Sequence, residues 1–185
     1  MSHAAALATL LEADAARMQA LAAVRTLGLP DSWIGAGFVR DAVWDWLHGR
    51  APSPPSSDID VIWFGPAQTG RSIDEALEAR LHAQIPALDW SVKNQARMHL
   101  RNGDSPYRST ADAMTRWPET ATAVAARLTT AGRVEINAPL GLEDLYRGRL
   151  RPTAHFAGTR RTMFEQRVHT KRWLERYPRL NTSLT

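Results

Sequence analysis

Two aspartates separated by one residue are the feature of the sequence that most clearly suggests chemistry. Asp58 and Asp60 stand at the start of the apolar run 59–64, which is typical of a strand buried on both faces. Side chains two residues apart on a strand point the same way, so both carboxylates would face one side. Two like charges about 4 Å apart repel by roughly 4 kcal/mol at an effective dielectric constant near 20, which favours a cation between them. The oxygen ligands favour Mg²⁺ or Mn²⁺, and two solvated aspartates at a loop end are the alternative.

A turn with two glycines precedes this pair along the chain. Gly35-Ala36-Gly37 follows a short strand candidate at 32–34 and leads into a helix expected over 38–48. Glycine allows close approach of a ligand to the backbone, and the start of a helix offers free N–H groups to a phosphate. Arg40 occupies the third glycine position of the dinucleotide-binding pattern, and no Gly-Lys-Ser/Thr follows, so neither that motif nor a P-loop is present.

A further strand is expected at residues 88–92. Asp89, Ser91 and Lys93 would share one face of it and its extension, so Asp89 could add a third carboxylate and Lys93 could meet a phosphate. The alternative is that these residues form an ordinary polar edge.

Together, the three features resemble the polymerase-β nucleotidyltransferase superfamily, and in particular the head domain of CCA-adding enzymes and bacterial poly(A) polymerases. A smaller bacterial family of nucleotidyltransferase-like proteins is the most similar, and the match covers roughly residues 30–180. The segments that carry the resemblance are 34–43, 58–61, 90–99, 117–124 and 138–151.

The resemblance implies a site and a mechanism. Gly35 and Gly37 would hold a triphosphate, and Asp58 and Asp60, with Asp89 as a third carboxylate, would bind two Mg²⁺ ions. One ion would activate the attacking hydroxyl and the other would stabilise the leaving pyrophosphate.

The resemblance also suggests phosphate contacts, on charge and chain position alone. Arg40, Lys93 and Arg97 are the candidates, with Arg able to grip a phosphate in a fork. For Arg40 the alternative is a salt bridge near Asp41 or to the acidic pair at 143–144.

This sequence departs from the family pattern in two respects. Ser91 stands where an acid is expected, which leaves Asp89 as the substitute. The nucleotide-selecting helix of CCA-adding enzymes is not recognisable, and the chain is too short for their tRNA-binding body, so CCA addition itself is not expected.

Length and composition limit the class of protein. The 185 residues predict a single domain, with an N-terminal helix in 1–28, a catalytic core in 30–146 and a basic helical extension in 147–185. The expected fold is α/β (α+β), a short mixed sheet packed against helices. Hydrophobic residues at 44% and charged residues at 23% argue against wholesale disorder.

Other features exclude several kinds of site. The absence of cysteine excludes a disulfide scaffold, a thiolate zinc site and a cysteine nucleophile. The sequence has neither an apolar run of the roughly 20 residues that a membrane span needs nor a signal peptide, so a cytoplasmic protein is expected.

Charge is unevenly distributed. The segment 147–179 holds ten basic and two acidic residues, a charge of +8, whereas residues 1–146 carry −4. Such a segment predicts a polyanionic partner, and an ordinary solvated helix is the alternative.

The remaining elements are expected from periodicity. Helices are predicted at 4–26, 72–81 and 161–177, the second capped by Ser72 with Glu75 completing a capping box. A short strand is predicted at 133–136, and residues 112–117 and 120–128 fit either type of element.

The sequence supports three hypotheses about function. The first is a Mg²⁺-dependent enzyme that transfers a nucleoside monophosphate from NTP to a hydroxyl group of a small molecule, protein or RNA, releasing pyrophosphate. The second is a degenerate nucleotide- or RNA-binding protein, suggested by Ser91 and the basic segment. The third is a toxin–antitoxin-type transferase acting on a partner protein.

Overall fold

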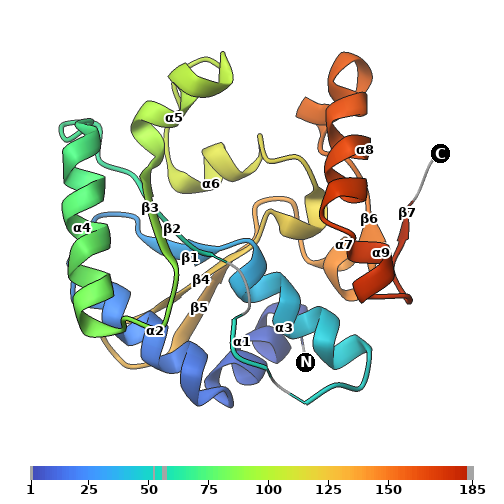
Figure 1. The fold of residues 1–185 in the computed structure, drawn as a ribbon, viewed down its shortest axis with the longest axis horizontal. Coiled ribbons are helices and arrows are strands. Elements are labelled where there is room, and N and C mark those ends of the chain that lie inside the picture. The colour runs from blue at the N-terminus through green and yellow to red at the C-terminus, as the bar shows by residue number, and fades with distance from the viewer. Residues whose placement is uncertain (1, 52, 56–57, 183–185) are drawn as a thin grey trace.

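A five-stranded mixed sheet forms the centre of the molecule (Figure 1). The computed structural model describes residues 2–51, 53–55 and 58–182. The order of the strands is β3-β2-β1-β4-β5, with β2 and β3 parallel and the other neighbours antiparallel. The strands are β1 (Trp33–Gly35), β2 (Ile59–Trp63), β3 (Trp90–Asn94), β4 (Ala125–Leu128) and β5 (Val134–Asn137). The predicted fold class, a mixed sheet packed against helices, is confirmed.

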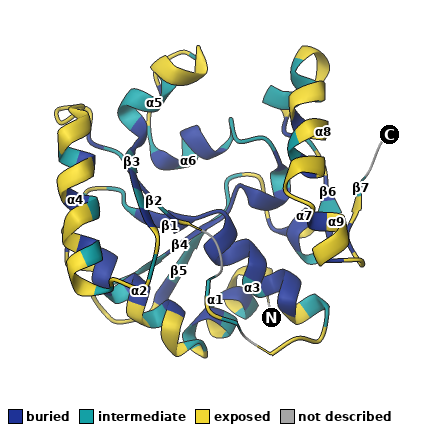
Figure 2. Ribbon diagram, viewed as in Figure 1, coloured by how far each residue is buried: buried dark blue, intermediate teal, exposed yellow. Residues whose placement is uncertain are grey.

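Helices cover the sheet and extend to the C-terminal side. The α-helices are α1 (His3–Glu12), α2 (Ala15–Arg25), α3 (Gly37–Leu47), α4 (Arg71–Gln84), α5 (Gln95–Asn102), α6 (Thr110–Met114), α7 (Glu143–Tyr146), α8 (Arg161–Thr170) and α9 (Trp173–Arg176). The 3₁₀ turns are η1 (Thr120–Thr122), η2 (Ala154–Phe156) and η3 (Gly158–Arg160), and β6 (Arg149–Leu150) pairs with β7 (Asn181–Thr182). Strands β1 and β2 are largely buried, whereas α4 and α8 expose their outer faces (Figure 2).

Alternation along β2 divides the sheet into two faces. Ile59, Val61 and Trp63 are fully buried in the main core. Asp60 and Ile62 point to the opposite face, because side chains alternate along a strand. Ile62 is buried there in a small second cluster that includes Met114 of α6. The first face therefore supplies the core, and the second carries polar groups toward a cleft.

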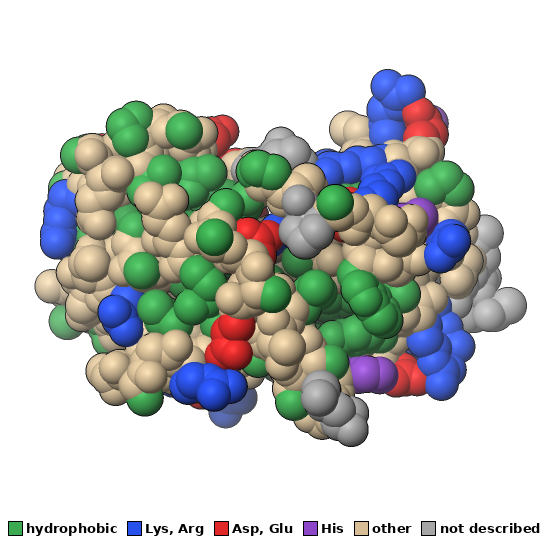
Figure 3. Space-filling view, turned by 90° about the horizontal axis from the view of Figure 1, so that it is seen from below, with side chains coloured by type: hydrophobic (Ala, Val, Ile, Leu, Met, Phe, Trp, Pro, Cys, Tyr) green, Lys and Arg blue, Asp and Glu red, His purple; other side chains and the backbone are tan. Residues whose placement is uncertain are grey.

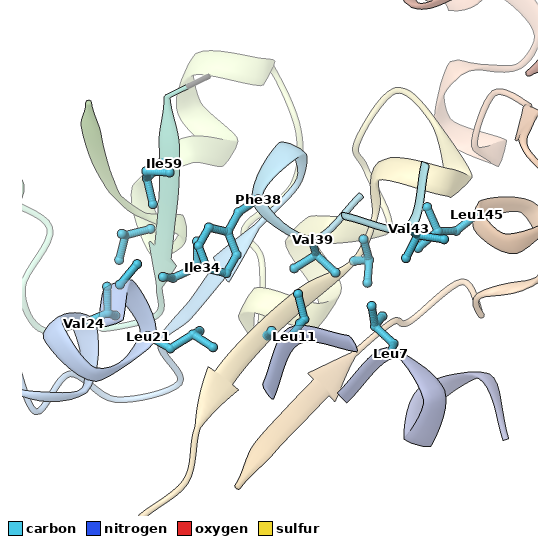
Figure 4. Close-up of a cluster of buried hydrophobic side chains, with 14 of the residues drawn as sticks. Leu7, Leu11, Leu21, Val24, Ile34, Phe38, Val39, Val43, Ile59 and Leu145 are labelled. Carbon is cyan, nitrogen blue, oxygen red and sulfur yellow. The ribbon is translucent and has the colours of Figure 1, made fainter. Parts of the chain in front are cut away.

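The main core joins the N-terminal helices to the sheet and α3. Leu7 and Leu11 of α1 meet Leu21 of α2, and Phe38 of α3 lies close by (Figure 4). The prediction of a single helix over 4–26 is wrong, because the helix is interrupted after Glu12 and a second helix begins after Asp14. The Asp14 carboxylate caps α2 by accepting a hydrogen bond of 3.0 Å from the backbone N–H of Arg17, a local bond that favours a new helix start.

Several other boundaries also differ from the prediction. The third strand lies two residues later than expected, at Trp90–Asn94, so Lys93 is inside it and Asp89 is outside. Helix α4 begins one residue earlier than predicted, after Gly70, and no side chain caps it. Instead of completing a capping box, Glu75 accepts a hydrogen bond of 2.9 Å from Arg71.

The last predicted helix is two helices. Arg172 has a φ of 51°, a left-handed conformation that ends α8 and starts α9. Phe164, Val168 and Trp173 are buried, as the periodicity predicts. In the predicted loop 51–57, residues 51 and 53–55 are in neither helix nor strand, and residues 52, 56 and 57 lie outside the described part.

The segments that the sequence left undecided are short mixed elements. Residues 110–114 form α6, and 120–122 form η1 before the strand β4. The strand predicted at 133–136 is β5, one residue later.

Candidate active site

A cleft of about 380 Å³ opens over the second face of the sheet. Figure 1 shows α5 and α8 rising on opposite sides of this end of the sheet, with α6 between them. Both predicted aspartates line the cleft together with four basic side chains. The lining residues are Ala36, Asp58, Asp60, Ile62, Ser91, Lys93, Gln95, Met98, Arg101, Asn102, Trp117, Pro118, Thr122, Arg167 and Lys171.

The structure brings Asp58 and Asp60 together in this cleft. Asp60 lies on β2 and is half-buried, whereas Asp58 is exposed just before the strand. Burial first, and the negative charge of Asp58 second, raise the pKa of Asp60 to about 6, against the lowering effect of Arg167, Arg40 and Lys171. The two carboxylates therefore repel each other in a partly desolvated place, which favours a bound cation.

The third predicted carboxylate has a different position. Asp60 is paired in register with Ser91, so a hydroxyl group occupies the neighbouring place on β3. Asp89 is exposed before that strand, and its backbone carbonyl accepts a hydrogen bond of 2.7 Å from the N–H of Ile59. Within the described part of the chain, Asp89 is outside the cleft lining, and no group of three His, Cys, Asp or Glu residues could hold a metal.

The glycine turn lies at the edge of the cleft. Gly35 ends β1, and a Cβ there would lie 2.8 Å from the indole of Trp117, which also lines the cleft. Ala36 has φ 51° and ψ −121°, a conformation that disfavours side chains, and it starts α3 without a side-chain cap. Gly37 is the first residue of that helix and is buried. The turn thus offers the start of an 11-residue helix to the cleft.

The cations of the cleft come from two sides. Lys93 on β3 and Arg101 on α5 lie on one side, and Arg167 on α8 and Lys171 at its end lie on the other. The Lys93 ammonium is 3.8 Å from the carboxylate of Glu78, so its charge is only partly balanced. Four cations and two carboxylates make the cleft a net positive site suited to a phosphorylated ligand.

Arg40 lies in the interior and is not among the residues that line the cleft. It is 6% exposed and pairs with Asp41 at 2.7 Å. Its guanidinium lies 4.8 Å from the ring centre of Trp44 and 4.7 Å from that of Trp173. This geometry agrees with the salt bridge to Asp41 that the sequence left open, and Arg40 acts on Asp60 through its charge.

Arg97 points to a buried acid next to the cleft. Its Nε donates a hydrogen bond of 3.1 Å to Asp74, which is 2% exposed. Asp74 also accepts from Trp63 Nε1 at 2.8 Å and from the backbone N–H of Asn94 at 3.0 Å. The pairing fixes the junction of β3 and α5, so Arg97 supports the segment that carries Lys93.

Asn94 completes this junction. It is fully buried, and its side chain bonds both backbone groups of Gly65, accepting at 3.1 Å and donating at 2.8 Å. It also accepts from the N–H of Ala96 at 3.0 Å, which caps α5. The polar residues around Lys93 therefore hold β3 and α5 in place.

Comparison with known proteins identifies the family. A family model described as a nucleotidyltransferase matches residues 22–182.

The chain belongs to this nucleotidyltransferase family.

It is therefore an enzyme of the transferase class that uses a nucleoside triphosphate. No curated protein sequence matches it significantly.

Solved structures show how far the likeness of this nucleotidyltransferase extends. An NMR structure described as revealing a CCA-adding enzyme head domain is 35% identical, covers 97% of this chain and 95% of that chain, and superposes with a TM-score of 0.86. The Thermotoga maritima CCA-adding enzyme complexed with tRNA is 16% identical over 98% of this chain and 42% of its own, with a TM-score of 0.58. The Bacillus stearothermophilus enzyme in complex with CTP is 17% identical over 84% and 39%, with a TM-score of 0.50. The nucleotidyltransferase spans about two fifths of these enzymes, which show its fold.

Three basic residues of the cleft had no sequence signal of their own. Arg101 lies beyond the predicted phosphate contacts, and Arg167 and Lys171 were counted only in the basic segment. Their approach to the aspartates depends on how α5 and α8 pack. Helical spacing gives one hint, because residues 167 and 171 are four apart and share a face.

Most of the basic C-terminal segment is neutralised within the chain. On the face seen from below in Figure 3, Lys and Arg side chains lie at separate places, several of them beside acidic ones. Five of its arginines pair with acids of the first 146 residues: Arg147 with Glu143, Arg151 with Asp144, Arg160 with Asp104, Arg167 with Glu119 and Arg176 with Asp41. Among the described residues, none of the helices is long and apolar enough to cross a membrane.

Proposed function

We propose that this nucleotidyltransferase transfers a nucleoside monophosphate from NTP to a hydroxyl acceptor in a Mg²⁺-dependent reaction at the cleft. The observation that carries the proposal is the pair Asp58 and Asp60, facing one cleft with four cations around it. In the reaction, the bond from the α-phosphorus to pyrophosphate breaks while a bond to the acceptor oxygen forms. The acceptor hydroxyl releases its proton to solvent water, and pyrophosphate leaves with the electron pair of the broken bond.

The donor set supports a magnesium site. Asp58 and Asp60 offer carboxylate oxygens, and Ser91 offers a hydroxyl beside Asp60. The pKa of Asp60 is raised by burial and, to a smaller extent, by the charge of Asp58, and a bound cation would offset both. Mg²⁺ commonly binds through one or two carboxylates together with substrate phosphates and water, so a two-carboxylate set fits it. Asp58 and Asp60 would hold the metal, which when bound would neutralise phosphate charge and activate the acceptor hydroxyl. Asp89 remains a candidate third ligand and would have to approach from outside the cleft lining.

The residues of the chain supply positioning and charge. We infer that Lys93 and Arg101 contact the phosphates and that the start of α3, after Gly35 and Gly37, offers backbone N–H groups to them. Arg97 holds the β3–α5 junction through Asp74, which keeps Lys93 in place. Positioning and charge neutralisation supply most of the catalysis in phosphoryl-transfer chemistry.

The acceptor is proposed only as a hydroxyl compound, with RNA and protein among the classes to be tested. The complexes with tRNA and CTP belong to enzymes more than twice as long as this chain. The experiment is a thermal-shift titration of ATP, GTP, CTP and UTP with and without Mg²⁺. Wild type, Asp58→Asn and Asp60→Asn are compared, with Asp112→Asn on α6 as a control outside the cleft lining.

A nucleotide at about 100 times its dissociation constant should add roughly 2.7 kcal/mol of stability. We expect a Mg²⁺-dependent shift in wild type and in the control that is lost in both cleft variants. Pyrophosphate release by wild type, absent in Asp58→Asn, would establish the chemistry. Metal-independent binding without pyrophosphate release would instead identify a binding protein of the same fold.

A further inference from the structure

Helix α8 carries one arginine whose side chain lines the cleft in a fixed orientation. Arg167 of α8 lines the cleft, and its side chain is 37% exposed. Its Nε donates a hydrogen bond of 2.9 Å to a carboxylate oxygen of Glu119. Its guanidinium carbon also lies 5.6 Å from the ring centre of Trp173. A guanidinium held through Nε retains its two terminal amino groups for another anion.

Glu119 is an unusual partner because it is fully buried. Its side chain is 0% exposed, and besides Arg167 it accepts a hydrogen bond of 2.8 Å from the Thr122 hydroxyl. A buried carboxylate loses its hydration and must be compensated by charge and hydrogen bonds. Such an arrangement restricts the rotamers of Arg167 far more than a surface salt bridge would.

The backbone around Glu119 is also tied down at the cleft. Thr120 N–H donates 3.0 Å to the carbonyl of Arg151, and Thr153 N–H donates 3.1 Å to the carbonyl of Pro118. These two bonds flank an isolated antiparallel β-bridge between Glu119 and Pro152, so the backbone segments around these two residues are paired. Pro118 and Thr122 line the same cleft, so the Arg167 anchor is part of its wall.

Lys171 lies one helical turn after Arg167 and lines the cleft with it. Among the described residues, its ammonium makes no hydrogen bond within 3.5 Å and no ion pair within 4.0 Å. The exposed Arg172, by contrast, pairs with Glu175 on α9 and is outside the cleft lining. Of these neighbouring cations, only Arg167 and Lys171 face the aspartates.

We propose that Arg167, oriented by Glu119 and joined by Lys171, binds a phosphate group of the substrate opposite Lys93 and Arg101. This inference rests on the proposed function, because it assigns a second phosphate-binding wall to the same cleft. Helix α8 thereby completes the site. Glu119 is a positioning residue, since it acts through Arg167 and does not itself touch the ligand.

The test measures anion affinity by isothermal titration calorimetry. Inorganic pyrophosphate, without metal, and Mg²⁺–NTP are titrated into wild type, Arg167→Ala, Arg167→Lys, Glu119→Gln and Lys171→Ala. Arg172→Gln is the matched control, because it removes a positive charge next to the same helix outside the cleft. Glu119→Gln keeps the shape of the buried side chain, and melting curves establish that each variant is folded.

We expect Arg167→Ala to weaken pyrophosphate binding about tenfold or more, as loss of a charge-assisted bidentate contact does. Arg167→Lys should recover only part of this affinity, and Glu119→Gln should weaken binding several-fold while folded. The control should change affinity less than twofold. Loss of affinity for Mg²⁺–NTP as well would place the donor phosphates on α8, whereas loss for pyrophosphate with unchanged NTP affinity would place the phosphate of an acceptor there.

Unchanged affinity for both ligands in folded Arg167→Ala would overturn the inference. This failure is distinct from failure of the proposed function. If wild type binds pyrophosphate through Arg167 but Asp58→Asn leaves nucleotide transfer intact, the metal-dependent mechanism is wrong and the phosphate site stands.

Discussion

At the scale of single residues, a side chain is unfavourable at two neighbouring positions at the end of β1, for different reasons. Ala36 has φ 51° and ψ −121°, which a side chain tolerates poorly. Gly35 has an ordinary backbone, but a Cβ there would lie 2.8 Å from Trp117. The glycines of the motif were interpreted as a phosphate turn, and packing against Trp117 is a second reason for Gly35.

Substituting these neighbours should shift stability in opposite directions. Ala36→Gly should raise the free energy of unfolding by about 1 kcal/mol, because it relieves backbone strain at a position that favours glycine. Gly35→Ala should lower it by about 2 kcal/mol, because Trp117 must move. Urea denaturation at neutral pH measures both variants. A loss of stability in Ala36→Gly would contradict the strained geometry.

Asp60 should make stability depend on pH. Its pKa is raised to about 6 in the folded protein from 3.8, so the folded state holds the proton more tightly than the unfolded state does. The free energy of unfolding therefore falls as pH rises from about 4 to about 6 and is then constant. A shift of that size corresponds to about 3 kcal/mol at full burial, and partial exposure reduces it to about 1–2 kcal/mol.

Asp60→Asn should therefore stabilise the metal-free protein at pH 8 and have little effect near pH 4. Denaturation in urea with a chelator present, at both pH values, measures the difference. Adding Mg²⁺ at pH 8 should stabilise wild type and leave Asp60→Asn nearly unchanged. Equal gains at the two pH values would show that the titration of Asp60 is not the cause.

The sequence predicts those residues of the cleft that lie close together along the chain. The spacing of Asp58 and Asp60, and the place of Lys93, follow from alternation along a strand. Arg167 reaches the same cleft from more than 100 positions later, so only the packing of α8 reveals it. Arg40 is the opposite case, because it lies close to the glycine turn along the chain but its guanidinium is enclosed between Trp44 and Trp173.

At the scale of elements, the Asp74 hub fixes how α4, β3 and α5 meet. Asp74 accepts hydrogen bonds from Trp63 Nε1, the N–H of Asn94 and the guanidinium of Arg97. Its carboxylate is 3% exposed, so water cannot replace these bonds. This role of Asp74 was not predictable from the sequence, because a polar residue in the first turn of a helix is ordinarily a solvent-facing capping residue.

Asp74→Ala should destabilise the fold by about 3 kcal/mol or more, since it leaves buried donors and the charge of Arg97 unpaired. Glu75→Ala is the control on the same helix, because its pair with Arg71 is exposed and should contribute less than about 1 kcal/mol. Chemical denaturation measures both. Similar small losses in the two variants would mean that the hub does not hold the elements together.

At the same scale, the boundaries of helices and strands depend on hydrogen bonds that the hydrophobic periodicity of the sequence does not reveal. The apolar spacing of residues 4–26 continues across Asp14, yet its carboxylate caps a new helix there. The third strand begins at Trp90, later than its hydrophobicity suggested, and pairs in parallel with β2 from Ile59 onward. Elements with several repeats of the hydrophobic pattern, such as α3, β2 and α4, were predictable in type and order, whereas α5 and α7 were not predicted and β4 was left undecided.

At the scale of the whole molecule, the acidic body and the basic C-terminal segment neutralise each other. Five arginines of that segment pair with acids of residues 1–146, and two more pair within it: Arg161 with Glu165 and Arg172 with Glu175. The uneven charge of the sequence is therefore explained in large part by contacts inside the chain. Composition alone could not distinguish this from a nucleic-acid-binding tail.

The salt dependence of RNA binding distinguishes these two interpretations. For single strands, the logarithm of the binding constant falls with the logarithm of salt concentration with a slope of about −0.7 per phosphate neutralised. A free segment of charge +8 would give a slope near −6, whereas the four cations of the cleft, with the rest of the segment paired internally, would give a slope near −3. Fluorescence anisotropy of labelled poly(U) across a range of NaCl concentrations measures this slope. We expect the shallow value, with Lys171→Ala making it shallower still and Arg172→Gln leaving it unchanged; a slope near −6 would mean that the internal ion pairs open and that the whole segment binds RNA.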